Sequence, residues 1–168
     1  ANNDIVGIRE YLNELDTNLS LLDSSIRTGN SMADAILNSK VSLAKAREID
    51  VRVDAHIPVK LKISEIDLCC ILGNLFDNAI DASMALPPQN RLIRVYMDMK
   101  GSRLYISFTN FTSQKKLGKL GRVFATTKGL GHGLGLSRIE TIVEKHDGYL
   151  SFNSEDGAFT AEILLPQE

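Results

Sequence analysis

The chain has 168 residues, of which 43% are hydrophobic and 24% are charged, and its formal net charge is −2. These values suit one globular domain with an appendage, and the lack of a basic excess argues against nucleic acid as the main partner. No stretch reaches the ~20 consecutive apolar residues that a membrane-spanning helix needs.

The first segment carries a heptad pattern that ends before Gly29. Its apolar residues are spaced alternately three and four apart, and they are Ile5, Ile8, Leu12, Leu15, Leu19, Leu22 and Ile26. This spacing forms one narrow seam, which is typical of a coiled coil or helical bundle; an ordinary amphipathic core helix is the alternative. Because the pattern is already under way at Ala1, we expect a fragment of a longer protein, with a stalk helix at residues 1–29 and a separate domain at 30–168.

The next part of the chain predicts two helices and two short strands. They are a helix at 31–48, strands at 49–53 and 59–63, and a helix from Ser64 to about Leu86. Ser64 followed by Asp67 three residues later has the pattern of a helix start, and two prolines stop this helix. Cys69 and Cys70 lie within it and are expected to be reduced and buried, which favours an intracellular setting.

The second half of the chain predicts two hairpins separated by a long loop and a helix. The hairpins pair 92–99 with 104–110 and 149–153 with 158–165, the loop covers 112–133, and the helix covers 134–147. Gly148 is the expected helix C-cap. Paired strands separated by helices predict an α+β fold, a two-layer α/β sandwich with a mixed, mostly antiparallel sheet covered by helices.

The helix after Ser64 has a polar stripe beside its apolar face. Asn74, Asn78 and Asp81 are spaced i, i+4, i+7 and therefore share one face. Asparagine is a mediocre helix former, and a solvated face more often carries Lys or Glu. Oxygen atoms in a row suit a hard cation such as Mg²⁺ that carries phosphates, although a plain surface stripe is the alternative.

A glycine-rich segment leads directly into the next helix, and it has the sequence Gly129-Leu130-Gly131-His132-Gly133-Leu134-Gly135-Leu136. Glycines let backbone N–H groups approach a phosphate, and a helix N-terminus adds partial positive charge. Basic residues precede the helix without any acidic residue, and they are Lys115, Lys116, Lys119, Arg122 and Lys128. A cationic flap over a triphosphate fits this pattern, with a plain solvated loop as the alternative.

The two motifs together resemble the GHKL (Bergerat) ATP-binding fold of gyrase, histidine kinases and mismatch-repair ATPases. The segment from Asn74 to Ala82 resembles its N box, and Gly131 to Leu136 resembles the G2 box of histidine kinases. Phe124 to Lys128 resembles the stretch that precedes G2. The resemblance covers about residues 49–166 and implies the ATP-binding catalytic domain of a sensor histidine kinase, preceded by part of a dimerisation stalk.

The resemblance also assigns roles by position. Asn78 would ligate the Mg²⁺ that bridges the phosphates of ATP, Asn74 would assist it, and Lys128 would neutralise the terminal phosphates. The glycines of the G2 box would shape the lid hinge and the phosphate cradle. The other residues assigned to the nucleotide site are Asp81, Thr127, Gly131, His132, Gly133, Leu134 and Gly135.

The chain departs from the family pattern at the adenine box. Kinases of this fold usually carry Asp-x-Gly-x-Gly, whose Asp accepts a hydrogen bond from the adenine amino group. Asn110 stands at the Asp position and the glycines are missing. An amide oxygen can accept that bond without the charge, so weak nucleotide binding is expected. With the Gly-His-Gly form of G2, this departure resembles the quorum-sensing (peptide-pheromone) subfamily of sensor kinases, with citrate and dicarboxylate sensors second.

The family needs a phosphoacceptor histidine on the first stalk helix, and residues 1–50 contain none. The heptad helix is therefore expected to be the second stalk helix. The resemblance further implies a homodimer through the stalk helices, a response regulator as partner, and a cytoplasmic domain of a protein anchored in the bacterial membrane. His56, His132 and His146 are not expected to be acceptors; His146 is expected to complement a helix dipole.

The chemistry at Asn74 separates this chain from ATP-hydrolysing relatives, which carry a Glu general base there. An amide cannot take a proton from water at neutral pH, so the chain is expected to bind ATP–Mg²⁺ without rapid hydrolysis or autophosphorylation. Three alternatives remain open: a GHKL ATPase clamp, a serine kinase of the anti-sigma type, and a degenerate scaffold that no longer binds nucleotide.

Overall fold

The computed structural model describes residues 26–113 and 130–168, with the backbone alone for 130–134. The helices in these ranges are α2 (Ser31–Ala46), α3 (Glu65–Ser83) and α4 (Leu130–Lys145), and η1 (Pro88–Asn90) is a short 3₁₀ turn. The strands are β1 (Asp50–Ala55), β2 (Leu92–Lys100), β3 (Arg103–Phe111), β4 (Tyr149–Glu155) and β5 (Ala158–Pro166). Most of the predicted heptad helix and of the glycine-rich loop lies outside the described ranges.

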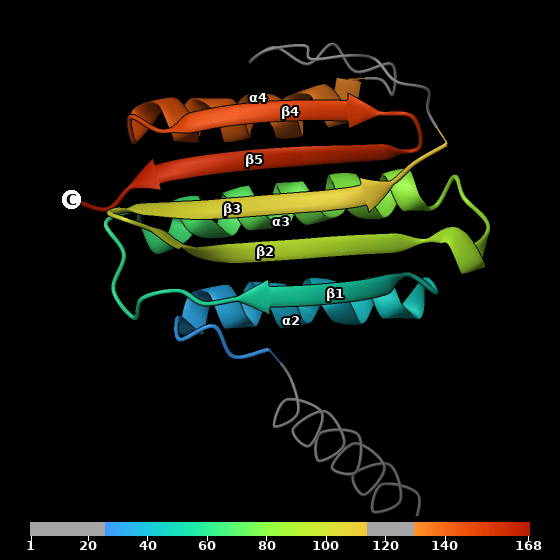
Figure 1. Cartoon of the computed structure of the whole chain (residues 1–168), viewed down its shortest axis with the longest axis horizontal. Coiled ribbons are helices and arrows are strands. Elements are labelled where there is room, and N and C mark those ends of the chain that lie inside the picture. The colour runs from blue at the N-terminus through green and yellow to red at the C-terminus, as the bar shows by residue number, and fades with distance from the viewer. Residues whose placement is uncertain (1–25, 114–129) are drawn as a thin grey trace, which may run out of the picture.

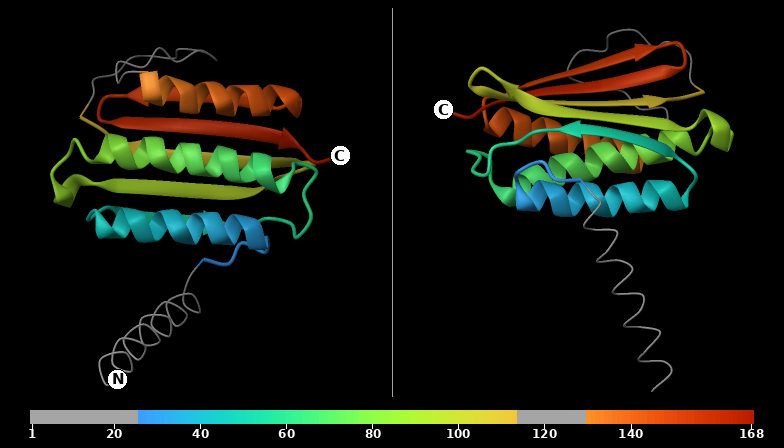
Figure 2. Two further views of the ribbon diagram at one scale, coloured as in Figure 1. Left: turned by 180° about the vertical axis from the view of Figure 1, so that it is seen from behind. Right: turned by 60° about the horizontal axis from the view of Figure 1, so that its bottom comes forward.

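The five strands form one mixed sheet in the order β1-β2-β3-β5-β4. β1 pairs with β2 in parallel, and the other neighbouring strands are antiparallel. The parallel pair is possible because α3 crosses from the end of β1 to the start of β2. The three helices lie side by side on one face of the sheet (Figures 1 and 2). This arrangement confirms the predicted two-layer sandwich.

Both early helices begin at side-chain caps. The Ser64 side chain accepts a hydrogen bond from Asp67 N at 3.2 Å, as the sequence predicted for the start of α3. The Asn30 side chain accepts from Ala33 N at 3.1 Å at the start of α2. Neither α2 nor α3 is long and apolar enough to cross a membrane, and the same holds for every helix in the described ranges.

The strand predicted at residues 59–63 is wrong. This segment is irregular, with bends at 59–60 and 62–63. Val59 O accepts a hydrogen bond from the Asn30 side chain at 3.4 Å, and Lys62 N donates to the Gln167 side chain at 2.8 Å. Ile63 is buried, whereas Val59 is 78% exposed. Apolar residues do alternate here, but Pro58 precedes them and no strand in the described part of the chain pairs with this segment.

The predicted bounds of α4 and its C-cap are also wrong. The helix begins at Leu130, four residues earlier than expected, and ends at Lys145. Gly148 was the expected C-cap, but Asp147 takes the left-handed conformation that is typical of a helix end, with a φ of 53°. Gly148 is needed for a different reason, because a Cβ there would lie 2.7 Å from Leu164 O in β5. The glycine lets the end of α4 pass close to the sheet.

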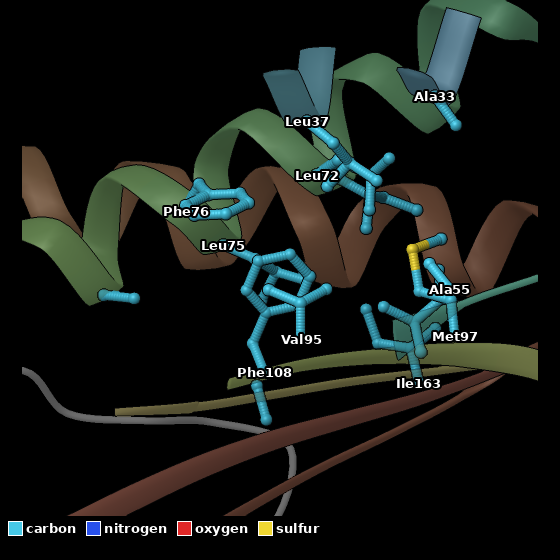
Figure 3. Close-up of a cluster of buried hydrophobic side chains, with 14 of the residues drawn as sticks. Ala33, Leu37, Ala55, Leu72, Leu75, Phe76, Val95, Met97, Phe108 and Ile163 are labelled. Carbon is cyan, nitrogen blue, oxygen red and sulfur yellow. The ribbon is translucent and has the colours of Figure 1, made fainter. Parts of the chain in front are cut away.

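The core lies between the helices and the covered face of the sheet. Alternate residues of β3, namely Leu104, Ile106 and Phe108, are buried against the helices. The Phe76 ring of α3 meets the Phe108 ring edge to face, with centroids 5.1 Å apart (Figure 3). This contact fixes the height of α3 above the sheet, and therefore fixes where its polar stripe lies.

An ion cluster joins the start of α3 to the end of α4. His146 Nε2 lies 2.9 Å and Lys145 Nζ lies 3.0 Å from Asp67 Oδ2. The hydrogen bond with His146, and then the one from Lys145, hold the pKa of Asp67 below its ordinary value of 3.8, although burial opposes them. His146, expected only to complement the helix dipole, thus has a carboxylate partner across the helix interface.

This cluster predicts a loss of stability in acid. A carboxyl group with a lowered folded pKa stabilises the fold above its ordinary pKa, and that stabilisation disappears as the pH falls through the lowered value. The free energy of unfolding should decrease between about pH 6 and about pH 3. We expect this decrease to be smaller in Asp67→Asn than in the unmodified chain, by on the order of 1 kcal/mol. Urea unfolding measures it. Asp50→Asn is the control, because the Asp50 side chain is 60% exposed, and its free energy of unfolding should decrease with pH as in the unmodified chain.

Candidate functional site

The polar stripe of α3 faces α4. α3 lies between α2 and α4 (Figure 2). On one side, Asp77 binds Lys40 of α2, with 2.6 Å between the charged atoms. On the other side, Gly135 of α4 lies so close that a Cβ there would be 3.1 Å from Asn74 Oδ1 and 3.8 Å from Asn78 Nδ2. The structure therefore brings together three predicted site residues from both motifs.

The two stripe amides differ in how they are satisfied. Asn74 Nδ2 donates to Cys70 O at 2.7 Å and contacts Cys70 Sγ at 3.3 Å. Asn78 Nδ2 is buried and, among the described residues, has no hydrogen-bond partner. A buried donor without an acceptor costs about 1–3 kcal/mol, and native proteins rarely leave one unless a ligand or water satisfies it. Asn78 therefore points to a ligand with acceptor atoms.

Two glycines of the second motif, Gly131 and Gly133, lie inside a helix where a loop was expected, whereas Gly135 lies in the predicted helix. Gly131, Gly133 and Gly135 all fall within α4 (Leu130–Lys145). A helical glycine costs up to about 1 kcal/mol relative to alanine, which is why the sequence favoured a loop. The close approach of Gly135 to Asn74 gives a physical reason for one of them, because a Cβ there would crowd the Asn74 oxygen and require that side chain to shift.

Asn110, the predicted adenine contact, lies on the covered face of the sheet. It is the last inward-facing residue of β3 and is only 4% exposed. Its Nδ2 donates to Phe111 O at 3.1 Å. If the amide were flipped, Asn110 Oδ1 would face Phe111 O, and two acceptors would meet. The nitrogen therefore faces Phe111 O, and Oδ1 is the acceptor atom that this side chain presents. That orientation agrees with the acceptor role expected from the sequence.

For most of the remaining predicted site residues, the structure does not describe the side chain. Asp81 is exposed on α3, one helical turn beyond Asn78. Thr127 and Lys128 lie outside the described ranges. His132 and Leu134 belong to the part of α4 that is described by its backbone alone.

A groove elsewhere on the domain does not contain the stripe. Its volume is about 680 Å³, and it lies where β1 and β2 begin and β3 ends. Residues lining it include Glu48, Asp50, Arg52, Arg91, Phe111 and Gly157. Because it mixes acidic, basic and apolar side chains, it has no single chemical preference for a ligand.

Sequence reasoning missed the contact between Cys70 and Asn74. The two residues are four apart on α3, so helical spacing places them on one face, but the cysteines were taken only as core residues. Both thiols are free, and Cys69 and Cys70 are half-buried instead of buried. Burial raises the pKa of the Cys69 thiol, with Glu65 adding to the effect.

Comparison with known proteins matches the GHKL domain family to residues 63–166. The probable C4-dicarboxylate sensor kinase of Halalkalibacterium halodurans is 28% identical over 83% of this chain and 28% of its own length. Sensor histidine kinase ZraS of Escherichia coli is 32% identical over 73% of this chain and 27% of its own length. The chain thus spans little more than a quarter of these relatives.

Solved structures share the fold. The mycobacterial sensor histidine kinase MprB superposes with a TM-score of 0.60 at 20% identity, covering 79% of this chain and 93% of that one. The catalytic domain of histidine kinase ThkA gives a TM-score of 0.60 at 21% identity, covering 79% of this chain and 91% of that one. The sheet and its three covering helices therefore have the architecture of histidine kinase catalytic domains.

Proposed function

The chain belongs to the GHKL domain family, and from this premise we propose that it is the ATP-binding catalytic domain of a two-component sensor histidine kinase. It would bind ATP–Mg²⁺ and transfer the γ-phosphoryl group to a histidine on a stalk helix of the parent protein. A response regulator aspartate would then receive that group. Sensor kinases among its relatives support this proposal.

One observation carries the proposal: the Asn78 amide nitrogen, which has no partner among the described residues, lies beside Gly135 of α4, with the Asn74 oxygen turned toward the same glycine. An asparagine amide has an oxygen that suits Mg²⁺ and a nitrogen that can donate to a phosphate oxygen. Asn78 would hold both, and Asn74 would add a second oxygen. Bound Mg²⁺ would offset the charge of the triphosphate, and Lys128 is proposed to assist it.

Calorimetric titration of the chain with ATP–Mg²⁺ tests this function. We expect saturable binding of one nucleotide per chain and weak binding of free ATP, because the amides hold the metal together with the phosphates. With γ-labelled ATP the chain should acquire no phosphohistidine and hydrolyse ATP slowly, since an amide at Asn74 is no general base. No saturable heat at millimolar ATP–Mg²⁺ would leave the degenerate scaffold as the better description.

Asn110 should make the site prefer adenine. Its oxygen can accept from the adenine amino group, whereas inosine triphosphate presents a carbonyl there. We expect the unmodified chain to bind ATP about tenfold more tightly than inosine triphosphate, and Asn110→Ala to bind the two equally. Competition titrations measure both ratios at a temperature where the variant is folded. A preference that survives in Asn110→Ala would assign base recognition to another residue.

We further propose that the parent protein is a peptide-pheromone sensor of the quorum-sensing type. Asn110 at the adenine box and the Gly131-His132-Gly133 form of G2 support this subfamily. A dicarboxylate sensor is the second candidate, since one relative is named as a probable C4-dicarboxylate sensor kinase. The ligand that changes autophosphorylation of the parent protein, a peptide or a dicarboxylate, separates the two.

The proposed arrangement in the parent protein follows the family. Residues 1–29 would be the second stalk helix, and residues 30–168 the catalytic domain. Just before their boundary, Thr28 O accepts a hydrogen bond from Ile57 N at 2.8 Å. Stalk helices from two chains would form a homodimer. The domain would lie in the cytoplasm, on a protein anchored in the bacterial membrane.

A further inference from the structure

The Asn74 amide nitrogen contacts two acceptor atoms of one residue, Cys70. Its nitrogen donates to Cys70 O at 2.7 Å, and the same nitrogen lies 3.3 Å from Cys70 Sγ. Cys70 is one helical turn before Asn74, and both residues are half-buried. A primary amide nitrogen carries two hydrogens to donate, and Cys70 offers it two acceptor atoms.

The contact with the Cys70 carbonyl sets the direction of the amide oxygen. A flip would bring Asn74 Oδ1 to the position 2.7 Å from Cys70 O that the nitrogen now holds, with acceptor against acceptor. The oxygen therefore points away from Cys70, to the side where Gly135 of α4 approaches it. Asn78, the next stripe amide, has no such tether on its nitrogen within the described residues.

We propose that Cys70 is a positioning residue of the nucleotide site, which holds Asn74 so that its oxygen is presented to the metal and phosphates. This inference rests on the proposed function. The backbone carbonyl at position 70 fixes which end of the amide faces Cys70, and the thiol adds a second contact to the same nitrogen. This second contact restricts the rotation of the amide further. Serine keeps an acceptor at this position, whereas alanine does not.

Binding measurements separate positioning from a general structural role. Cys70→Ala should raise the Kd for ATP–Mg²⁺ about threefold to tenfold, while Cys70→Ser should stay within about twofold of the unmodified chain. In an Asn74→Ala background, Cys70→Ala should have no further effect, because the group that it positions is gone. Cys69→Ala, at the neighbouring free thiol, is the matched control and should leave Kd unchanged.

Two outcomes of these binding measurements would overturn the proposal. One is an unchanged Kd in Cys70→Ala when the unmodified chain binds ATP–Mg²⁺. The other is the same increase in Kd with and without Asn74, which would mean that Cys70 acts through the helix as a whole. In either case the proposed nucleotide site would stand.

A nucleotide-free measurement keeps the two proposals distinguishable. In ¹⁵N-labelled protein, the side-chain NH₂ signals of Asn74 should move and exchange faster with water in Cys70→Ala, but not in Cys69→Ala. If the unmodified chain bound no ATP–Mg²⁺, the proposed function would fail while this signal still decided whether Cys70 holds the amide. Unchanged Asn74 signals in Cys70→Ala would refute the positioning role directly.

Discussion

Replacing Asn78 with alanine is expected to abolish measurable binding of ATP–Mg²⁺, with Kd rising at least about a hundredfold. The amide lies beside Gly135 with a buried nitrogen that has no partner within the described chain. Its removal takes away a metal ligand and a phosphate donor together. Because the lost nitrogen had no acceptor, the variant should be no less stable than the unmodified chain without nucleotide.

Asn90→Ala is the matched control for this result. Asn90 is an exposed asparagine in η1, outside α3 and α4, and Asn90→Ala removes the same side chain. Calorimetry with ATP–Mg²⁺ should give the unmodified Kd for Asn90→Ala. If Asn78→Ala bound as tightly as Asn90→Ala, the metal site would have to be sought away from the polar stripe.

Replacing Phe76 with alanine should lower the free energy of unfolding by about 3–5 kcal/mol. The ring is fully buried and meets Phe108 at an interplanar angle of 86°. The change removes apolar burial, leaves a cavity between α3 and the sheet, and ends an edge-to-face contact. Because the same helix carries Asn74 and Asn78, nucleotide binding should weaken as well.

Urea unfolding measures this loss, and Phe111→Ala provides the comparison. Phe111 is 42% exposed at the end of β3, so its removal should cost less than about 1 kcal/mol. Equal losses in the two variants would mean that Phe76 does not anchor α3. A large loss in Phe76→Ala with unchanged Kd for ATP–Mg²⁺ would separate the core from the site.

Most of the fold follows from local patterns in the sequence. The alternation in β2 and β3 predicted a hairpin, and Ser64 predicted the start of α3, because each signal is a short-range contact that the structure keeps. Residues 59–63 show the limit. Their alternation also fits a strand, but a strand needs a neighbour, and the sequence does not reveal that Asn30 and Gln167 take those backbone groups.

The sequence predicted which face of α3 carries the site residues, but not which atoms of those residues contact each other. Helical spacing placed Asn74 and Asn78 on one side of α3, and the structure places Gly135 against that side. Which amide has a partner depends on side-chain torsions, so the tether from Cys70 could not be seen. The early start of α4 was hidden because glycine signals a loop locally, whereas Gly131 and Gly133 take helical backbone here.

The central claim is that ATP–Mg²⁺ binds between the polar stripe of α3 and the glycine-bearing start of α4. The most direct test is a crystal structure of the chain with Mg²⁺ and a non-hydrolysable ATP analogue. We predict the Asn78 oxygen on the metal, the phosphates beside Asn74 and Gly135, and the adenine amino group at Asn110 Oδ1. A nucleotide found instead in the groove beside Arg52 and Phe111, with the stripe empty, would contradict the claim.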